Sequence, residues 1–136
     1  MTSSYGRAII NFIRQALVGQ SLPVFGDGKQ TRSFCYVTDT VTGLLKFLLA
    51  DEINGEIVNI GNQNEVSITG LASKIISMTN SESKILFKPL PEDDPLRRLP
   101  DISKAGRLFG FNPTVSLDDG LKRTIEWAKE DLQIPR

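Results

Sequence analysis

The chain has 136 residues, of which 40% are hydrophobic and 24% charged, and its 16 basic side chains balance its 16 acidic ones. This length fits a single domain, residues 1–136, and the balanced charge excludes the field that would attract nucleic acid. A single cysteine excludes an internal disulfide, and the lack of histidine excludes histidine-dependent catalysis and makes a zinc site unexpected. The sequence has no apolar run long enough to span a membrane and no signal-peptide pattern, so we expect a cytoplasmic protein.

The first elements are a helix and a strand. Apolar residues recur at helical spacing over 7–18, and Gly19 is a natural stop. Residues 22–25 form a short β-type run, and the sequence predicts a second strand over 33–37. The pattern therefore begins as mixed α/β.

The middle of the chain predicts a buried helix followed by a strand. Thr38 or Asp39 can cap a helix over 39–50, and a strand is expected over 56–62 after a turn. The helix has four apolar positions spaced for burial: Val41, Leu44, Leu45 and Leu48.

The last half predicts three more helices and one strand. Ser67 and Ser116 are expected as N-caps, and Asp101 as the cap of a short helix between them. A strand is predicted over 84–88, and a proline-rich polar loop follows over 89–100. Trp127, on the last helix, is expected to pack in the core.

A glycine-punctuated turn leads into the second predicted strand and carries Lys29 and Arg32. Glycine lets a backbone approach a ligand closely, and the planar guanidinium of arginine matches phosphate or carboxylate. We therefore expect an anionic small molecule to bind here. The alternative is a surface arginine paired with Asp27 or Asp39.

Four strings carry a resemblance that covers nearly the whole chain. They are LPVFGDGKQTRSFCYVTDTVTG at 22–43, EIVNIGN at 56–62, DDPLRRLPDISKA at 93–105 and LFGFNP at 108–113. In this order and spacing they resemble the C-terminal half of the extended short-chain dehydrogenase/reductase family that acts on nucleotide sugars. The resemblance implies an α/β substrate-binding portion with short strands, four to five helices and no Rossmann half.

Within this family the strings are most similar to the branch that decarboxylates UDP-glucuronate, with dTDP-glucose 4,6-dehydratases and UDP-glucose 4-epimerases as relatives. The family holds NAD on a Rossmann domain with a glycine-rich loop and a Tyr-x-x-x-Lys pair, and this chain has neither motif. We therefore expect NAD only in a full-length enzyme and none on this chain alone. The implied partners are a UDP- or dTDP-sugar, a Rossmann domain in cis or trans, and a homo-oligomer.

The resemblance also implies site residues. Arg32 matches an arginine that reaches the diphosphate and supports catalysis, because oxidation at sugar C4 and loss of CO₂ leave an enolate that a cation stabilises. Arg98 matches a second arginine on the nucleotide, and its neighbour Arg97 is an equal candidate. The alternative for this pair is a solvated loop neutralised by nearby carboxylates.

Further candidates are weaker. Pro23, Val24 and Phe25 match a segment that holds the pyrimidine base, although Phe25 can equally be a core residue. Asn11 and Arg7 lie near a stretch that flanks the substrate in the family. Two functions remain open: part of a nucleotide-sugar lyase or epimerase, or a nucleotide-sugar-binding or assembly module without catalysis.

Overall fold

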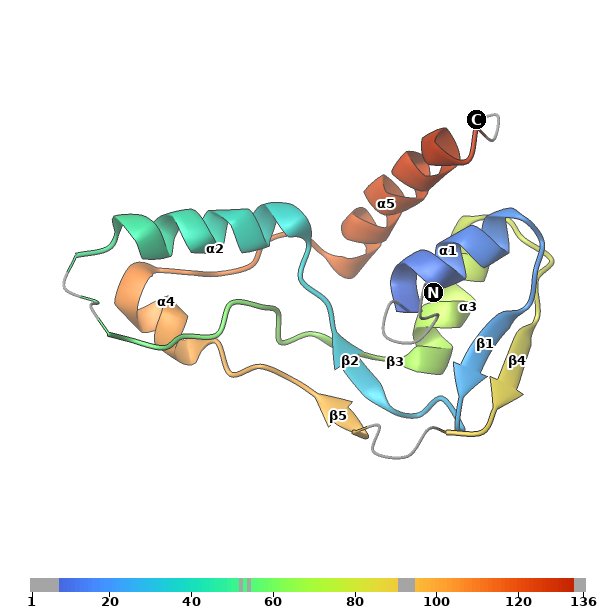
Figure 1. Ribbon diagram of the computed structural model, residues 1–136, viewed down its shortest axis with the longest axis horizontal. Helices are drawn as coiled ribbons and strands as arrows, with labels where there is room; N and C mark the ends of the chain where they lie inside the picture. Colours follow the sequence, from blue (N-terminus) through green and yellow to red (C-terminus); the bar gives the residue numbers. More distant parts are fainter. Residues whose placement is uncertain (1–7, 52, 54, 91–94, 134–136) are drawn as a thin grey trace.

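The computed structural model describes residues 8–51, 53, 55–90 and 95–133. Figure 1 shows an elongated mixed α/β arrangement with two groups of helices joined by extended segments. No helix in the described ranges is long and apolar enough to cross a membrane. In chain order the elements are α1 (Ala8–Leu17), β1 (Leu22–Phe25), β2 (Thr31–Ser33), α2 (Val37–Leu49), β3 (Glu65–Ser67), α3 (Ile68–Met78), β4 (Ile85–Lys88), β5 (Arg97–Arg98), α4 (Ser103–Phe109) and α5 (Leu117–Asp131).

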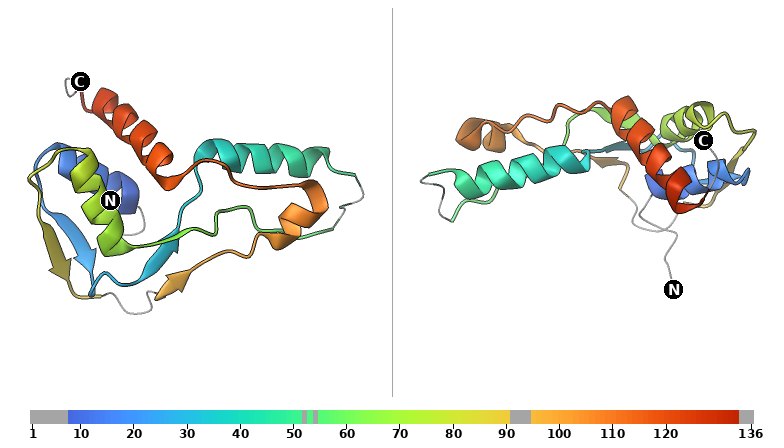
Figure 2. Two further views of the ribbon diagram at one scale, coloured as in Figure 1. Left: turned by 180° about the vertical axis from the view of Figure 1, so that it is seen from behind. Right: turned by 90° about the horizontal axis from the view of Figure 1, so that it is seen from above.

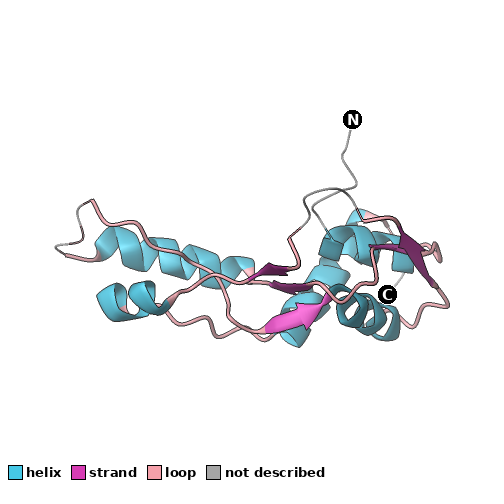
Figure 3. Cartoon of the chain, turned by 90° about the horizontal axis from the view of Figure 1, so that it is seen from below, coloured by secondary structure: helices cyan, strands magenta, loops and turns pink. Residues whose placement is uncertain are grey.

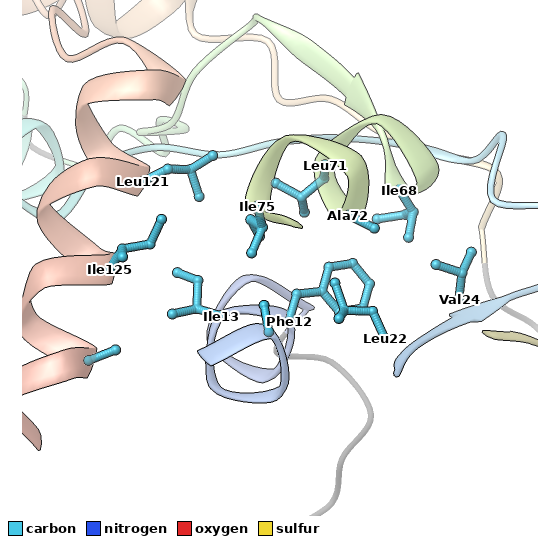
Figure 4. Packing of buried hydrophobic residues seen from close by; sticks show 12 residues of the cluster. Phe12, Ile13, Leu22, Val24, Ile68, Leu71, Ala72, Ile75, Leu121 and Ile125 are labelled. Atoms are coloured by element: carbon cyan, nitrogen blue, oxygen red, sulfur yellow. The ribbon is translucent and has the colours of Figure 1, made fainter. Parts of the chain in front are cut away.

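The larger core lies where α1, α3 and α5 meet beside β1. Their apolar faces interdigitate around Ile13, Leu71 and Leu121, which are almost completely buried (Figure 4). Burial of such a side chain contributes about 1.5–3 kcal/mol, so this cluster anchors the fold. The helix predicted over 7–18 and the strand predicted over 22–25 are confirmed with small shifts in their ends.

Two small sheets lie beside this core. β1 pairs in parallel with β4, which confirms the strand predicted over 84–88. In the second sheet β2 is central, antiparallel to β3 and parallel to β5. Figure 3 shows the strands of this sheet lying between the two groups of helices.

The strand predicted over 33–37 is wrong in its bounds. The strand is Thr31–Ser33, and Val37 already belongs to α2. The physical reason is strand pairing: residues 31–33 pair with β3 and β5, whereas no strand of the described residues lies next to 34–36. The aromatic and β-branched composition of the run therefore did not decide its structure.

The helix predicted over 39–50 forms, but its cap and its burial were predicted wrongly. Tyr36 is the N-cap and makes no side-chain cap bond. The buried Asp39 instead accepts hydrogen bonds from the backbone N–H groups of Thr114 and Val115, at 3.1 and 2.9 Å. The four positions expected in the core are exposed: Val41, Leu44, Leu45 and Leu48.

The strand predicted over 56–62 does not form. In the described part of the chain, no strand lies next to residues 56–60, and they run as an extended segment. Val58 and Ile60 pack beside a small second core of Ile102, Ala105 and Phe111. This small core joins α4 to the segment, and α2 closes over it (Figure 2).

Two of the predicted helix N-caps form as expected. The hydroxyl of Ser67 accepts a hydrogen bond from the Gly70 N–H at 3.0 Å, and that of Ser116 accepts one from Asp119 at 3.1 Å, so both caps are confirmed. Asp101 lies one residue before the cap position of α4 but accepts a hydrogen bond from the Ser103 N–H at 2.9 Å. These caps succeed because they depend on residues three positions apart or fewer.

Candidate functional site

Two arginines from distant parts of the sequence lie side by side in the second sheet. In the parallel pairing of β2 with β5, Arg32 is in register with Arg98. Residues in register point to the same face of a sheet, so both guanidiniums rise from one face. Two guanidiniums on one face of a sheet can contact the same anion, because each offers a planar set of donors that matches a phosphate.

Strand alternation places Arg97 on the opposite face. Its register partner is Thr31, and its guanidinium donates two hydrogen bonds to Glu65, at 2.9 and 2.6 Å. The Thr31 hydroxyl donates to the same carboxylate at 2.6 Å. Arg97 is therefore tied to β3, and Arg98, not Arg97, shares a face with Arg32.

Glu65 holds the three strands of this sheet together. Hydrogen bonds from Arg97 and then from Thr31 lower the pKa of its carboxyl from 4.5 to about 2, and the pairing raises the pKa of Arg97. The group that connects β3 to both other strands is thus a carboxylate at neutral pH. Its bonds to Arg97 and Thr31 are compatible with the backbone register that puts Arg98 beside Arg32.

The carboxylates considered as partners for Arg32 bind elsewhere. Asp27 lies 3.5 Å from the ammonium of Lys29, and Asp39 accepts hydrogen bonds from Thr114 and Val115. Arg32 is half-buried, and its Nη1 donates to the carbonyl of Thr31 at 2.8 Å. The carboxylates expected to neutralise Arg98, at 92–94, lie outside the described residues.

The turn that precedes β2 is held in place rather than flexible. The buried Gln30 donates from Nε2 to the Phe25 carbonyl at 2.7 Å. The Lys29 N–H donates to Asp27 at 3.0 Å, and this bond is the main cause of the lowered pKa of that carboxyl. A Cβ at Gly28 would collide with Thr69, and its φ of +72° favours glycine, so glycine is required here.

The candidate base-binding segment lies on β1. Val24 is completely buried in the larger core, its backbone included, and it pairs with Phe87 of β4. Pro23 and Phe25 alternate to the other side and are half-buried. Because the turn at 26–30 leads directly from Phe25 to Thr31, Figure 1 shows the end of β1 close to the start of β2.

The two remaining candidates lie on or before α1. Asn11 is half-buried on this helix, whose packing partners are α3, α5 and β1. Figure 1 shows α1 in the same group of helices as α3 and α5, beside β1. Arg7 lies outside the described residues.

A cavity that the sequence did not indicate lies next to the sheet. It has a volume of about 450 Å³ and is bounded by the 34–37 segment, by α5 and by Ile9. The Arg123 guanidinium lies 5.5 Å from the centre of the Tyr36 ring, at the edge of this cavity. Trp127, expected in the core, lines the cavity and is 52% exposed.

No group of three or more His, Cys, Asp or Glu side chains that could hold a metal occurs among the described residues. The chemistry that the two arginines offer is electrostatic: two guanidiniums lie on one face of a sheet, next to a backbone turn. A diphosphate presents oxygens at a spacing that such a pair can contact from two sides.

Comparison with known proteins gives consistent relatives. The family model described as GDP-mannose 4,6 dehydratase matches residues 2–124. The chain is 46% identical to UDP-glucuronic acid decarboxylase 1 of Danio rerio over 94% of its own length and 30% of that protein. It is 43% identical to UDP-N-acetyl-alpha-D-glucosaminuronate decarboxylase of Bacillus cytotoxicus, over 93% of the chain and 41% of the relative.

Solved structures of epimerases are also similar to this chain. The epimerase Mth375 of Methanothermobacter thermautotrophicus superposes with a TM-score of 0.90 at 34% identity, over 96% of this chain and 39% of that one. UDP-glucuronic acid 4-epimerase of Bacillus cereus, solved with UDP-glucuronic acid and NAD, superposes with a TM-score of 0.86 at 35% identity, over 90% and 40%. The chain thus spans well under half of the length of each of these relatives. The chain belongs to the extended short-chain dehydrogenase/reductase family of nucleotide-sugar enzymes, and it matches their C-terminal portion.

Proposed function

We propose that this chain is the substrate-binding domain, residues 1–136, of an NAD-dependent UDP-glucuronate decarboxylase, and that it binds the diphosphate of a UDP-sugar between Arg32 and Arg98. The observation that carries the proposal is the register of β2 with β5, which sets these two guanidiniums on one face. The decarboxylases among the relatives favour this branch of the family. The single cysteine and the composition keep the cytoplasm as the proposed location.

In this proposal the pyrimidine lies along Pro23 and Phe25, the buried Val24 holds these two residues on the core, and Asn11 and Arg7 flank the sugar. Arg32 has a second role, because the loss of CO₂ from a 4-keto sugar acid leaves an enolate beside it that a guanidinium stabilises. Arg97 is not assigned to the ligand, since Glu65 holds it on the other face.

The described residues do not fit NAD. The sequence has no glycine-rich turn between a strand and a helix, and β3 runs directly into α3, where the Ser67 hydroxyl already occupies the Gly70 N–H. The dinucleotide pyrophosphate needs such N–H groups. We therefore place NAD, which would accept the hydride from the sugar, on a Rossmann domain supplied in cis or trans, and expect this chain alone to be inactive.

Calorimetric titration with UDP tests the site. We expect binding that weakens about 10- to 150-fold in Arg98→Leu, because a charge-assisted contact contributes about 1.5–3 kcal/mol. Arg107→Leu, which removes an exposed arginine on α4, is the matched control and should leave the affinity unchanged. The site assignment fails if neither UDP nor UDP-glucuronate binds, with or without the Rossmann half.

Turnover separates the remaining alternatives. A protein that joins this chain to a Rossmann half should convert UDP-glucuronate to UDP-xylose with release of CO₂. Conversion of dTDP-glucose to its 4-keto-6-deoxy derivative with loss of water would identify a dehydratase, and inversion of UDP-glucuronate at C4 without CO₂ an epimerase. Binding of UDP without any turnover in that protein would favour a nucleotide-sugar-binding or assembly module.

A further inference from the structure

The segments proposed to hold the two ends of the nucleotide lie in different sheets. Phe25 ends β1, which pairs with β4, whereas Arg32 lies on β2, between β3 and β5. Ladder hydrogen bonds fix only the strands of one sheet against each other, so no ladder among the described strands sets the position of Phe25 relative to Arg32. The turn between β1 and β2, residues 26–30, has to do this.

Gln30 connects the two ends of this turn. It directly precedes β2, its side chain is buried, and its Nε2 donates to the Phe25 carbonyl at 2.7 Å. A hydrogen bond in a buried position of low dielectric is stronger than the same bond in water. The last residue of β1 is thus tied by a side chain to the residue before β2.

The backbone of the turn has a separate anchor, the N-terminus of α3. The Ile68 N–H donates to the Gln30 carbonyl at 3.0 Å. The Thr69 N–H donates to the Gly28 carbonyl at the same distance. Both N–H groups belong to the first turn of α3, where they have no partner within the helix. Loss of the Gln30 side-chain bond would therefore leave the turn attached to α3 and would release only the end of β1 at Phe25.

We propose that Gln30 is a positioning residue of the nucleotide site: its amide holds the Phe25 carbonyl, and so keeps the base segment, Pro23 and Phe25, at a fixed distance from the pair of Arg32 and Arg98. A ligand with both a base and a diphosphate gains from this arrangement, because a rigid frame lets it make both contacts without a further ordering cost. A ligand with only one of these groups gains nothing. The inference rests on the proposed function for the ligand and for the arginine pair.

In this role Gln30 acts through Phe25 and does not touch the ligand. Its side chain is only 7% exposed, and its Nε2 is already bonded to β1. The role therefore differs from that of Arg32 and Arg98, whose guanidiniums contact the diphosphate in the proposal. A substitution at Gln30 should change how well the two halves of the site cooperate, and leave each half intact.

Titration of Gln30→Met with UDP and with inorganic pyrophosphate tests this role. Methionine keeps the length of the side chain but has no donor. We expect the affinity for UDP to fall about three- to tenfold, the usual effect of one lost hydrogen bond, and the affinity for pyrophosphate to change by less than about twofold. A general weakening of the site would lower both affinities by one factor, so their ratio is the readout. An unchanged ratio would overturn the proposal.

Two further variants calibrate this ratio. Gln20→Met, at an exposed glutamine after α1, should leave both affinities unchanged. Arg98→Leu should weaken UDP and pyrophosphate together, because both ligands carry the diphosphate that the arginine pair contacts. Gln30→Met should thus differ from Arg98→Leu in which ligand it affects.

Hydrogen exchange in the unaltered chain gives a readout that does not require a variant to fold. The side-chain amide of Gln30 should exchange at least about tenfold more slowly than that of Gln20, and it should stay slow when UDP is bound. Exchange as fast as that of Gln20 would overturn the proposal. Exchange that UDP accelerates would do the same, because it would show that the ligand displaces the amide from Phe25.

The same titrations separate this inference from the proposed function. If the unaltered chain binds UDP and pyrophosphate and Gln30→Met keeps the ratio of their affinities, Gln30 has no positioning role and the diphosphate site remains. If the unaltered chain binds neither ligand, the diphosphate site is wrong and the role of Gln30 falls with it.

Discussion

At the scale of single residues, Glu65 gives a sharp pH dependence. Its pKa of about 2 in the folded chain lies below the ordinary 4.5, so its bonds to Arg97 and Thr31 add stability above pH 4.5 and lose it as the pH falls toward 2. Carbon-detected NMR of the Glu65 carboxyl should show a midpoint near pH 2. In Arg97→Gln the midpoint should rise toward 4.5, since the strongest of the bonds is lost.

Asp27 is the internal control for this titration. Its pKa is lowered mainly by the Lys29 backbone N–H, which Arg97→Gln does not touch, so its midpoint should stay in place. An ordinary midpoint for Glu65 in the unaltered chain would contradict the bridge between the three strands.

At this scale the sequence could not distinguish the roles of Arg97 and Arg98. Adjacent arginines in a loop are equivalent until a strand assigns them to opposite faces, and β5 forms only because β2 is its neighbour. Glu65, which binds Arg97 on the face opposite to Arg32, lies 32 positions from Arg97 in the sequence. Family resemblance indicated the arginines, but no local pattern indicates their anchor.

At the scale of elements, two helical glycines form a matched pair. A Cβ at Gly43 would lie 2.8 Å from Ile60 and from Phe111, whereas one at Gly106 meets nothing closer than 3.5 Å. Alanine gains about 0.5–1 kcal/mol of helix preference at both sites. Urea unfolding should therefore find Gly106→Ala stabilising and Gly43→Ala less stable than it by about 1–3 kcal/mol, the usual cost of overpacking. Equal stability of the two variants would show that α2 can shift away from Phe111 without cost.

Whether an element could be predicted from the sequence depends on whether its stabilising contacts are local. Helices α1, α3 and α5 follow from local periodicity and local caps, and all three form. Strands depend on partners far along the chain: β2 needs residues 65–67 and 97–98, and residues 56–60 have no strand beside them in the described part. The apolar face of α2 was predicted to be buried, but it is exposed, because periodicity shows that residues share a face and not what covers that face.

At the scale of the whole molecule, the exposed face of α2 predicts how the free chain behaves in solution. A stripe from Val37 to Leu48 with no charge on it should drive weak, open-ended self-association as concentration rises, because water gains entropy when such surface is covered. Sedimentation velocity from about 10 µM to 1 mM should show a weight-average mass that increases steadily without a stable dimer. In Leu48→Asp the increase should largely disappear, whereas Val18→Asp should behave like the unaltered chain.

Joining the chain to a nucleotide-binding lobe should suppress this association as well. In the proposed enzyme the Rossmann domain would cover the stripe intramolecularly, at an effective concentration in the millimolar range or above, and leave little apolar surface for another copy. A discrete dimer that persists in the joined protein, and that Leu48→Asp dissociates, would mean that a second copy covers α2. A homo-oligomer of the joined protein that survives Leu48→Asp would use another surface and is compatible with the diphosphate site.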